Sequence, residues 1–185
     1  MRIISGELKG KTIDFLKSSI TRPLKDSVKE NIFNILEHSS LISVNLINSS
    51  ILDLYSGIGS FGLECISRGA KKVTFVEKDS NAINILRKNL TNLYANKKAA
   101  IISDKIELFL KNDLSEKFEI IFLDPPFSDN SYLDILKTIK EKKVLKKNHI
   151  IIIHRERKTL DNFRDILDPL LIRQYGRSKI VFGKF

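Results

Sequence analysis

Three glycines close to residue 60 have the spacing of a loop that binds a nucleotide-containing ligand. Gly57, Gly59 and Gly62 fit the pattern G-x-G-x-x-G, and Glu77 lies 20 residues after Gly57. Glycines at such a turn let the backbone approach a ligand closely, and an acidic residue ending the next strand can accept hydrogen bonds from ribose hydroxyls. By itself, this pattern fits NAD, FAD and S-adenosylmethionine equally well.

Asp53 discriminates among these ligands. It stands four residues before Gly57, at the expected carboxyl end of the preceding strand. A carboxylate at that place would repel the pyrophosphate of a dinucleotide, and it would attract a ligand that carries an ammonium and a sulfonium group. Asp53 therefore favours S-adenosylmethionine.

A second group of residues, Asp124-Pro125-Pro126-Phe127, directly follows an apolar run. Open α/β sheets bind ligands outside the carboxyl ends of their strands, so we expect this group to face the same crevice as the glycine loop. Asp124 can accept a hydrogen bond from an exocyclic amine, the prolines fix the backbone, and Phe127 offers a face for base stacking. The group predicts chemistry on a planar amine.

Short apolar runs that alternate with helical patterns must position these residues. The apolar runs predict five strands, at residues 51–55, 72–77, 99–103, 118–123 and 148–154. Apolar positions at helical spacing predict helices over 61–67, 82–90 and 133–139, and two closing strands are expected within 170–184. Continuously apolar strands separated by helices predict an α/β fold with a doubly wound, mostly parallel, seven-stranded sheet.

The first 45 residues differ from the rest, and we expect them to form a basic extension to a sheet domain over residues 46–185. Residues 2–5 and 12–15 can pair as a hairpin around Lys9-Gly10-Lys11. Pro23 then opens an expected helix, whose apolar face comprises Val28, Ile32, Phe33, Ile35 and Leu36.

The net charge of the 185 residues is +10, and the excess of bases is unevenly placed. Residues 1–29 carry seven bases and three acids, residues 137–158 carry nine and two, and residues 50–136 carry eleven and twelve. A near-neutral middle between basic flanks indicates a ligand-binding core whose surroundings face a polyanion such as nucleic acid.

Composition excludes several other classes of protein. Hydrophobic residues make up 42% and charged residues 29%, an ordinary globular balance. The single cysteine, Cys65, rules out a disulfide scaffold, and no Cys/His cluster has zinc-ligand spacing, so we expect no metal. No apolar run is long enough for a membrane span or a signal peptide. We therefore expect a cytoplasmic protein without a membrane partner, and its small size favours a monomer.

The loop from Asp53 to Gly62, Glu77 and the Asp124–Phe127 run resemble the motifs of S-adenosylmethionine-dependent methyltransferases that act on amino groups. Four further segments, MRIISG, TRP, VKENIFNIL and GLECISRGA, resemble the signature of the RsmD-type family. That family methylates the exocyclic N2 amine of one guanine in small-subunit (16S) ribosomal RNA. The resemblance implies a Rossmann-like fold, S-adenosylmethionine as cofactor with S-adenosylhomocysteine as product, and 16S RNA or the small subunit as partner.

The resemblance also implies roles for individual residues. Asp124, Pro125 and Phe127 are the expected catalytic residues, since their carboxylate, carbonyl and ring would hold the amine and its base. The expected cofactor-binding residues are Asp53, Tyr55, Gly57, Gly59, Glu77 and Asp104, the last by a loose match to the family's adenine-contacting segment. The expected RNA-binding residues form a basic flank beside the crevice: Arg2, Lys9, Lys11, Arg22 and Lys25.

Other readings remain open on these residues. The same chemistry fits a methyltransferase acting on DNA adenine or a protein glutamine, although no separate target-recognition domain for DNA is visible in 185 residues. An NAD-dependent dehydrogenase is opposed by Asp53 and by the position of Asp124. A non-catalytic RNA-binding assembly factor would keep the fold. We interpret His154 and Cys65 as structural residues.

Overall fold

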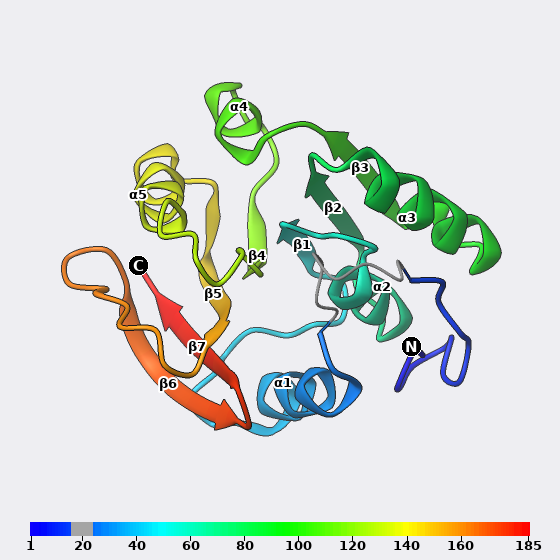
Figure 1. Ribbon diagram of the computed structural model, residues 1–185, viewed down its shortest axis with the longest axis horizontal. Coiled ribbons are helices and arrows are strands. Elements are labelled where there is room, and N and C mark those ends of the chain that lie inside the picture. The colour runs from blue at the N-terminus through cyan, green and yellow to red at the C-terminus, as the bar shows by residue number, and fades with distance from the viewer. Residues whose placement is uncertain (16–23) are drawn as a thin grey trace.

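A seven-stranded sheet runs through the centre of the protein (Figure 1). The computed structural model describes residues 1–15 and 24–185. The strand order is β3-β2-β1-β4-β5-β7-β6, with β1 to β5 parallel and β7 antiparallel to both of its neighbours. The strands are β1 (Ser50–Leu54), β2 (Lys72–Glu77), β3 (Ala99–Ser103), β4 (Phe118–Leu123), β5 (Leu145–Glu156), β6 (Asp168–Tyr175) and β7 (Ser178–Lys184). The predicted fold class is confirmed.

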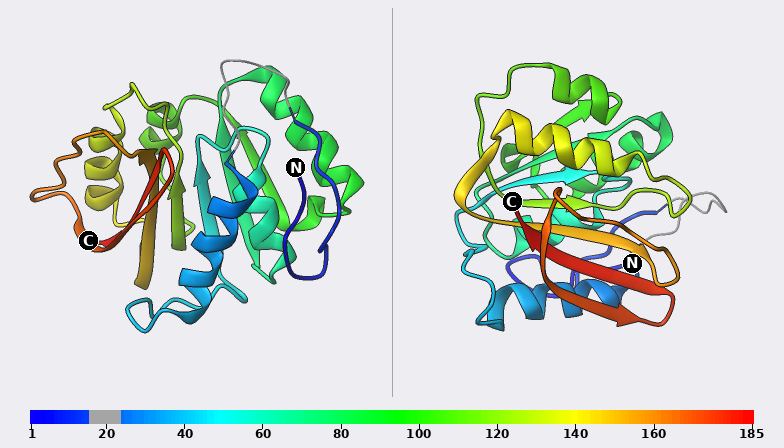
Figure 2. Two further views of the ribbon diagram at one scale, coloured as in Figure 1. Left: turned by 60° about the horizontal axis from the view of Figure 1, so that its bottom comes forward. Right: turned by 90° about the vertical axis from the view of Figure 1, so that its left-hand side faces the viewer.

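Helices cover both faces of the sheet, with α1, α2 and α3 on one face and α4 and α5 on the other (Figures 1 and 2). Their bounds are α1 (Asp26–His38), α2 (Ser60–Ser67), α3 (Ser80–Asn92), α4 (Ile106–Lys111) and α5 (Tyr132–Lys142), with a short 3-10 helix, η1 (Asn96–Lys98). The sequence analysis predicted α1, α2, α3 and α5, but not α4.

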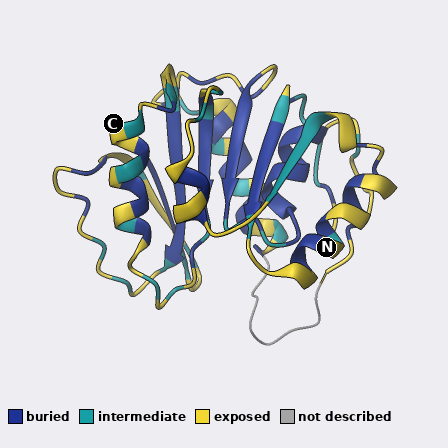
Figure 3. Ribbon diagram, turned by 90° about the horizontal axis from the view of Figure 1, so that it is seen from above, coloured by how far each residue is buried: buried dark blue, intermediate teal, exposed yellow. Residues whose placement is uncertain are grey.

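Two apolar cores result from the alternation of side chains along the strands. Ile51 packs in the core beneath α1, α2 and α3, and its neighbour Leu52 packs in the core beneath α4 and α5. In β4, Ile120 packs in the first of these cores and Ile121 in the second. The central strands are therefore buried on both sides, as Figure 3 shows, and this explains their continuously apolar sequence.

The ends of several elements differ from the sequence prediction. β1 stops at Leu54 rather than at residue 55, because Tyr55 takes the left-handed conformation with φ 57°. β5 is longer than predicted at both ends, since it runs from Leu145 to Glu156. The predicted hairpin is present as one antiparallel bridge between Arg2 and Thr12. The expected helix start at Pro23 lies outside the described residues, and α1 begins at Asp26.

The buried carboxylate of Glu64 anchors the N-terminal segment to α2. Its oxygens accept hydrogen bonds from the backbone N–H groups of Ile4 and Ser5, at 2.8 and 2.9 Å. Arg68 also donates to it at 2.9 Å, and the buried Lys29 ammonium lies 3.6 Å away. Burial lowers the pKa of Lys29, while the charge of Glu64 acts in the opposite direction. The carboxylate thus satisfies two backbone donors and faces two cations.

Asn89 connects the same segment to the glycine loop. Its side-chain oxygen accepts from the Asp14 N–H at 2.8 Å, and its amide nitrogen donates to the carbonyls of Asp14 and Ile58 at 3.1 and 3.3 Å. One buried amide on α3 therefore holds the extension and the loop together.

In the described parts of the chain, no helix has the length and apolar character needed to cross a membrane.

Glu64→Ala is expected to lower the free energy of unfolding by about 3–5 kcal/mol, because it leaves Lys29 buried without its nearest counter-charge. Glu37→Ala is the matched control, since Glu37 pairs with Arg68 at a more exposed position and should cost less than about 1 kcal/mol. Urea denaturation of both variants measures the difference. Equal losses of stability would contradict the anchoring role.

Candidate active site at the carboxyl edge of the sheet

The carboxyl ends of four neighbouring strands bring the predicted site residues to one edge. Leu54, the last residue of β1, pairs with Val76 in β2 and with Leu123 in β4. The backbone N–H of Asp124 donates to the carbonyl of Leu54 at 3.3 Å, and that of Asp104 donates to the carbonyl of Glu77 at 3.1 Å. The glycine loop, Glu77, Asp104 and Asp124 therefore share one edge, as predicted.

The glycines of the loop between β1 and α2 meet two different requirements. Gly57 has φ 54°, and a Cβ built on it would meet no atom within 4 Å, so the loop leaves open space there. A Cβ on Gly59 would lie 2.4 Å from Leu86, and one on Gly62 would lie 2.3 Å from Phe75. Gly59 and Gly62 thus allow close packing of the loop and α2, whereas Gly57 leaves its ligand side free.

The Glu77 carboxylate holds the glycine loop from the side. One oxygen accepts from the Gly57 N–H at 2.8 Å. The other accepts from the N–H groups of Lys78 and Asp79, at 2.8 and 2.9 Å. Glu77 is thereby fixed at the end of β2, next to Asp104, and its side chain is partly exposed.

Asp53 is almost fully buried, with 1% of its surface exposed, and accepts a hydrogen bond from the Gly62 N–H at 3.0 Å. Burial raises the pKa of Asp53 well above its usual range, and the nearby carboxylates of Asp124 and Glu77 raise it further. Three carboxylates therefore lie within electrostatic reach of one another at this edge. A cationic ligand would offset their repulsion.

The turn after β4 is fixed by the side chain of Arg155, which is fully buried. Its guanidinium donates to the backbone carbonyls of Pro126 and Phe127, at 3.1 and 3.3 Å, and to the Asn130 side chain at 3.1 Å. No donor in the described part of the chain bonds the carbonyl of Pro125. The side chain of Arg155 thus fixes the turn, and the Pro125 carbonyl remains free to accept a hydrogen bond.

Asp161 balances the charge of Arg155. It accepts from Arg155 at 3.0 Å and from the Tyr132 hydroxyl at 2.7 Å, and it pairs with the Lys179 ammonium at 2.6 Å. Burial opposes ionisation of Asp161, but hydrogen bonds from Lys179, Tyr132, Arg155 and Thr159 outweigh it and lower the pKa of the carboxyl. The Arg155 guanidinium also lies over the Tyr132 ring, 4.4 Å from its centroid. The support of the turn is a closed, buried polar network.

His154 was interpreted from sequence as a structural residue, but the structure brings it into contact with the predicted catalytic group. Its Nδ1 lies 2.8 Å from Asp124 Oδ1, and its Nε2 lies 2.9 Å from Ser178 Oγ. Its ring meets Phe127 edge-on, with centroids 5.5 Å apart. The sequence signal for His154 and Arg155 was their place as polar residues directly after four isoleucines of β5, at the same sheet edge.

The predicted RNA-binding residues lie on the N-terminal segment. The described members, Arg2, Lys9, Lys11 and Lys25, are all exposed, and Arg22 lies outside the described residues. Within the described residues, hydrogen bonds from this segment to the rest of the fold run to α1, α2 and α3. The contacts of this segment with α2 are made to Glu64 and Ser67, in the carboxyl-terminal half of the helix and away from the glycine loop that precedes it.

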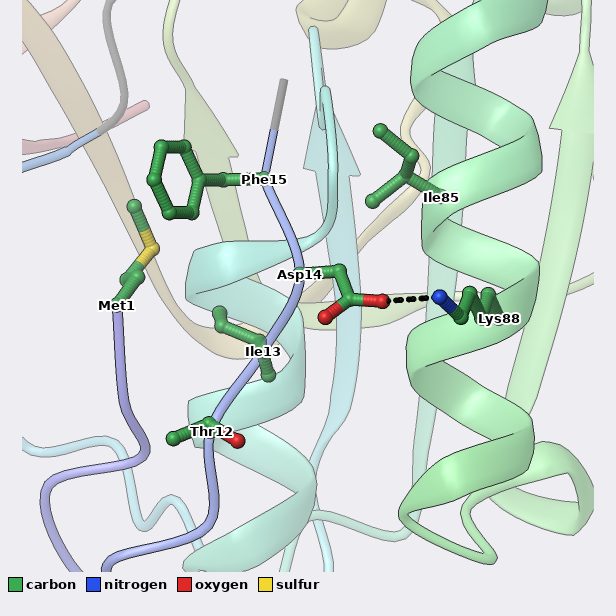
Figure 4. A pocket seen from close by; sticks show the side chains of 7 residues that line it. All are labelled: Met1, Thr12, Ile13, Asp14, Phe15, Ile85 and Lys88. Carbon is green, nitrogen blue, oxygen red and sulfur yellow. Dashed lines mark ion pairs between the residues drawn. The ribbon is translucent and has the colours of Figure 1, made fainter. Parts of the chain in front are cut away.

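A hollow of about 520 Å³ opens between this segment and α3 (Figure 4). An ion pair of 2.7 Å between Asp14 and Lys88 spans it, and its lining ends at Phe15, the last residue described before Leu24. None of the residues that line it belongs to the turn after β4.

Within the described residues, no three His, Cys, Asp or Glu side chains gather in a way that would hold a metal ion.

A family model described as "Conserved hypothetical protein 95" matches residues 1–184. The chain belongs to this family. Ribosomal RNA small subunit methyltransferase D of Haemophilus influenzae is 37% identical to it over 159 residues, which cover 85% of this chain and 79% of that protein. The predicted resemblance to the RsmD-type methyltransferases is thereby confirmed.

Solved structures agree with the family assignment. One from Haemophilus influenzae, named provisionally as a methylase, is 31% identical and has a TM-score of 0.79, covering 98% of this chain and 96% of that chain. Another from Escherichia coli, named provisionally as a methyltransferase, has a TM-score of 0.84 and covers 99% of this chain and 96% of that chain. Its 24% identity makes it a comparison of fold alone.

The residues at the sheet edge fit S-adenosylmethionine, the cofactor of such methyltransferases. Its ammonium and sulfonium charges match the carboxylates of Asp53, Asp124 and Glu77, and the open space at Gly57 admits a ligand against the backbone. The pyrophosphate of a dinucleotide would meet the same carboxylates with the wrong charge.

Asp53→Asn is expected to weaken cofactor binding without lowering the thermal stability of the protein. Because the folded protein raises the pKa of Asp53, ionisation of this group costs stability once the pH rises above the unfolded-state value of ~3.9. The asparagine can still accept from Gly62, so the melting temperature at pH 7 should equal or exceed that of the wild type, with the difference vanishing in acid. Calorimetry should show about tenfold weaker binding of S-adenosylmethionine.

Asp113→Asn is the control, since it removes an exposed carboxylate beyond α4. It should change neither the melting temperature nor the affinity. An unchanged affinity in Asp53→Asn would remove Asp53 from the cofactor site.

Proposed function

We propose that this chain transfers a methyl group from S-adenosylmethionine to the exocyclic N2 amine of a guanine in 16S ribosomal RNA. We further propose that it acts as a monomer in the cytoplasm and takes its RNA free or within the small ribosomal subunit. The observation that carries the proposal is the rigid turn Asp124–Phe127, held by Arg155 directly beside the glycine loop. The name of the Haemophilus influenzae relative supports ribosomal RNA as the substrate.

The cofactor would be held by the ends of β1, β2 and β3. Asp53, Tyr55 and the backbone of Gly57 and Gly59 would face its methionine part, and Glu77 would accept from its ribose hydroxyls. Asp104 lies next along the edge, where the adenine amine is expected. When bound, S-adenosylmethionine supplies an electrophilic methyl group on a sulfonium.

The turn after β4 would prepare the amine to react. A guanine amine is a poor nucleophile, because its lone pair is delocalised into the ring. Hydrogen bonds from its two N–H groups to the Asp124 carboxylate and the Pro125 carbonyl would favour a pyramidal nitrogen with a directed lone pair. Orientation of this kind can supply about 7–11 kcal/mol of the barrier. Phe127 would stack on the base, which contributes roughly 1–3 kcal/mol.

Asp124 also provides a destination for the proton. The amine nitrogen becomes acidic once it carries the new methyl group, and the carboxylate that already accepts its N–H can then take the proton. Because the turn lies at a sheet edge, the target guanine must leave its stack to reach it. The basic residues of the N-terminal segment would contact the surrounding phosphates.

Asp124→Asn is expected to lower kcat by about 10²–10⁴-fold, because the amide cannot take the proton and has only one oxygen acceptor. The assay measures transfer of labelled methyl to unmodified small subunits and to free ribosomal RNA, with nucleoside analysis of the product. Asp134→Asn, on the exposed side of α5, is the control and should retain wild-type kcat. Methyl on DNA or protein but not on RNA would overturn the proposed substrate.

Lys9→Gln and Lys11→Gln are expected to weaken RNA binding uniformly across RNA sequences. Each lost phosphate contact should reduce the slope of log affinity against log salt by about 0.7–0.9. Lys97→Gln, exposed on η1, is the control. Filter binding over a salt series measures the slopes, and a wild-type slope near zero would exclude phosphate contacts from the binding.

A further inference from the structure

We propose that His154 is a positioning residue for methyl transfer, and that its Nδ1–H donates to Asp124 and thereby fixes the carboxylate. This inference rests on the proposed function, in which Asp124 accepts from the substrate amine. The carrying observation is the chain of contacts from Ser178 Oγ to His154 Nε2, at 2.9 Å, and from His154 Nδ1 to Asp124 Oδ1, at 2.8 Å.

The chemistry of Asp124 decides the direction of the hydrogen bond at Nδ1. An ionised Asp124 carboxylate can only accept, so Nδ1 must carry the proton. The Ser178 hydroxyl can donate to Nε2 of a neutral imidazole or accept from it when the ring carries a second proton, so it bonds Nε2 in either state. Since the His154 side chain is 7% exposed, water offers few alternative partners. Both ring nitrogens are satisfied by residues of the fold.

The sheet holds the imidazole in this place. His154 is part of β5 and pairs with Ile180 of β7, and Ser178 begins β7 two residues earlier, opposite Glu156. Phe127 meets the imidazole edge-on at an interplanar angle of 83°. One side chain therefore contacts both the predicted proton acceptor and the predicted stacking ring.

Occupation of one Asp124 oxygen has a direct consequence for the reaction. With Oδ1 bonded to His154, the carboxylate cannot rotate freely about its bond to Cβ. Oδ2 is then left as the acceptor for the guanine N–H. His154 does not itself touch the reacting atoms in this arrangement, so it acts through Asp124 and Phe127 on their orientation.

The kinetic test compares two substitutions that differ in their hydrogen-bond donor. His154→Leu fills the site without a donor, and should lower kcat by about 100-fold with little change in KM for RNA, because a misplaced carboxylate affects the transition state more than binding. His154→Asn places an N–H near the position of Nδ1 and should recover most of this loss. His149→Leu, near the other end of β5, is the control and should keep wild-type kcat.

The outcomes separate positioning from a structural role. Wild-type kcat in His154→Leu overturns the inference, and so does a loss confined to KM. A loss of thermal stability that both variants share, without the recovery of kcat in His154→Asn, overturns it as well.

A second measurement needs no substrate and so separates this inference from the proposed function. Nitrogen-15 NMR of the ring atoms reports the protonation of each histidine, and His154→Leu assigns the signals. We expect Nδ1 of His154 to carry a proton at neutral pH and Ser178→Ala to shift the Nε2 signal. An unprotonated Nδ1 overturns the inference even if the enzyme methylates RNA. A protonated Nδ1 in a protein that transfers no methyl supports the hydrogen bond and overturns the proposed function alone.

Discussion

Arg155 carries a positive charge in the interior, with none of its side chain exposed. A buried guanidinium is tolerated only where its donors and its charge are both satisfied. Here the donors bond the carbonyls of Pro126 and Phe127, and Asp161 balances the charge. The conformation of the turn after β4 is thus tied to a buried ion pair, and the turn cannot move without exposing that charge or leaving it unpaired. This constraint therefore also sets the positions of Asp124 and Phe127.

The sheet edge around the glycine loop carries an excess of negative charge, in contrast with the paired charge of Arg155. Asp53, Asp124 and Glu77 place three carboxylates near one another, and burial together with the two neighbouring charges raises the pKa of Asp53. The backbone N–H of Gly62 donates to Asp53 and acts in the opposite direction, and that of Gly57 donates to Glu77. A bound cation would offset the repulsion between the carboxylates, so affinity for a cationic cofactor and stability of the free protein oppose each other at this edge.

The N-terminal segment is integrated with the sheet rather than merely attached to it. Ile3 and Phe33 lie in the same apolar core as Ile51 and Phe61. Glu64 satisfies the backbone of this segment, and Asn89 bonds both to it and to the glycine loop. A change in the position of the segment would therefore reach the glycine loop through one buried amide.

The sequence by itself determined the strands, the glycine loop and the turn after β4, because apolar runs, Gly57 and Asp124-Pro125-Pro126-Phe127 are local patterns. It missed α4, whose six residues show too little periodicity. The tertiary structure alone decided the partners of the turn. His154 and Asp124 are separated by 30 residues, and Glu64 and Ile4 by 60. No local spacing encodes such contacts, since they arise only when strands from distant parts of the chain pair in one register.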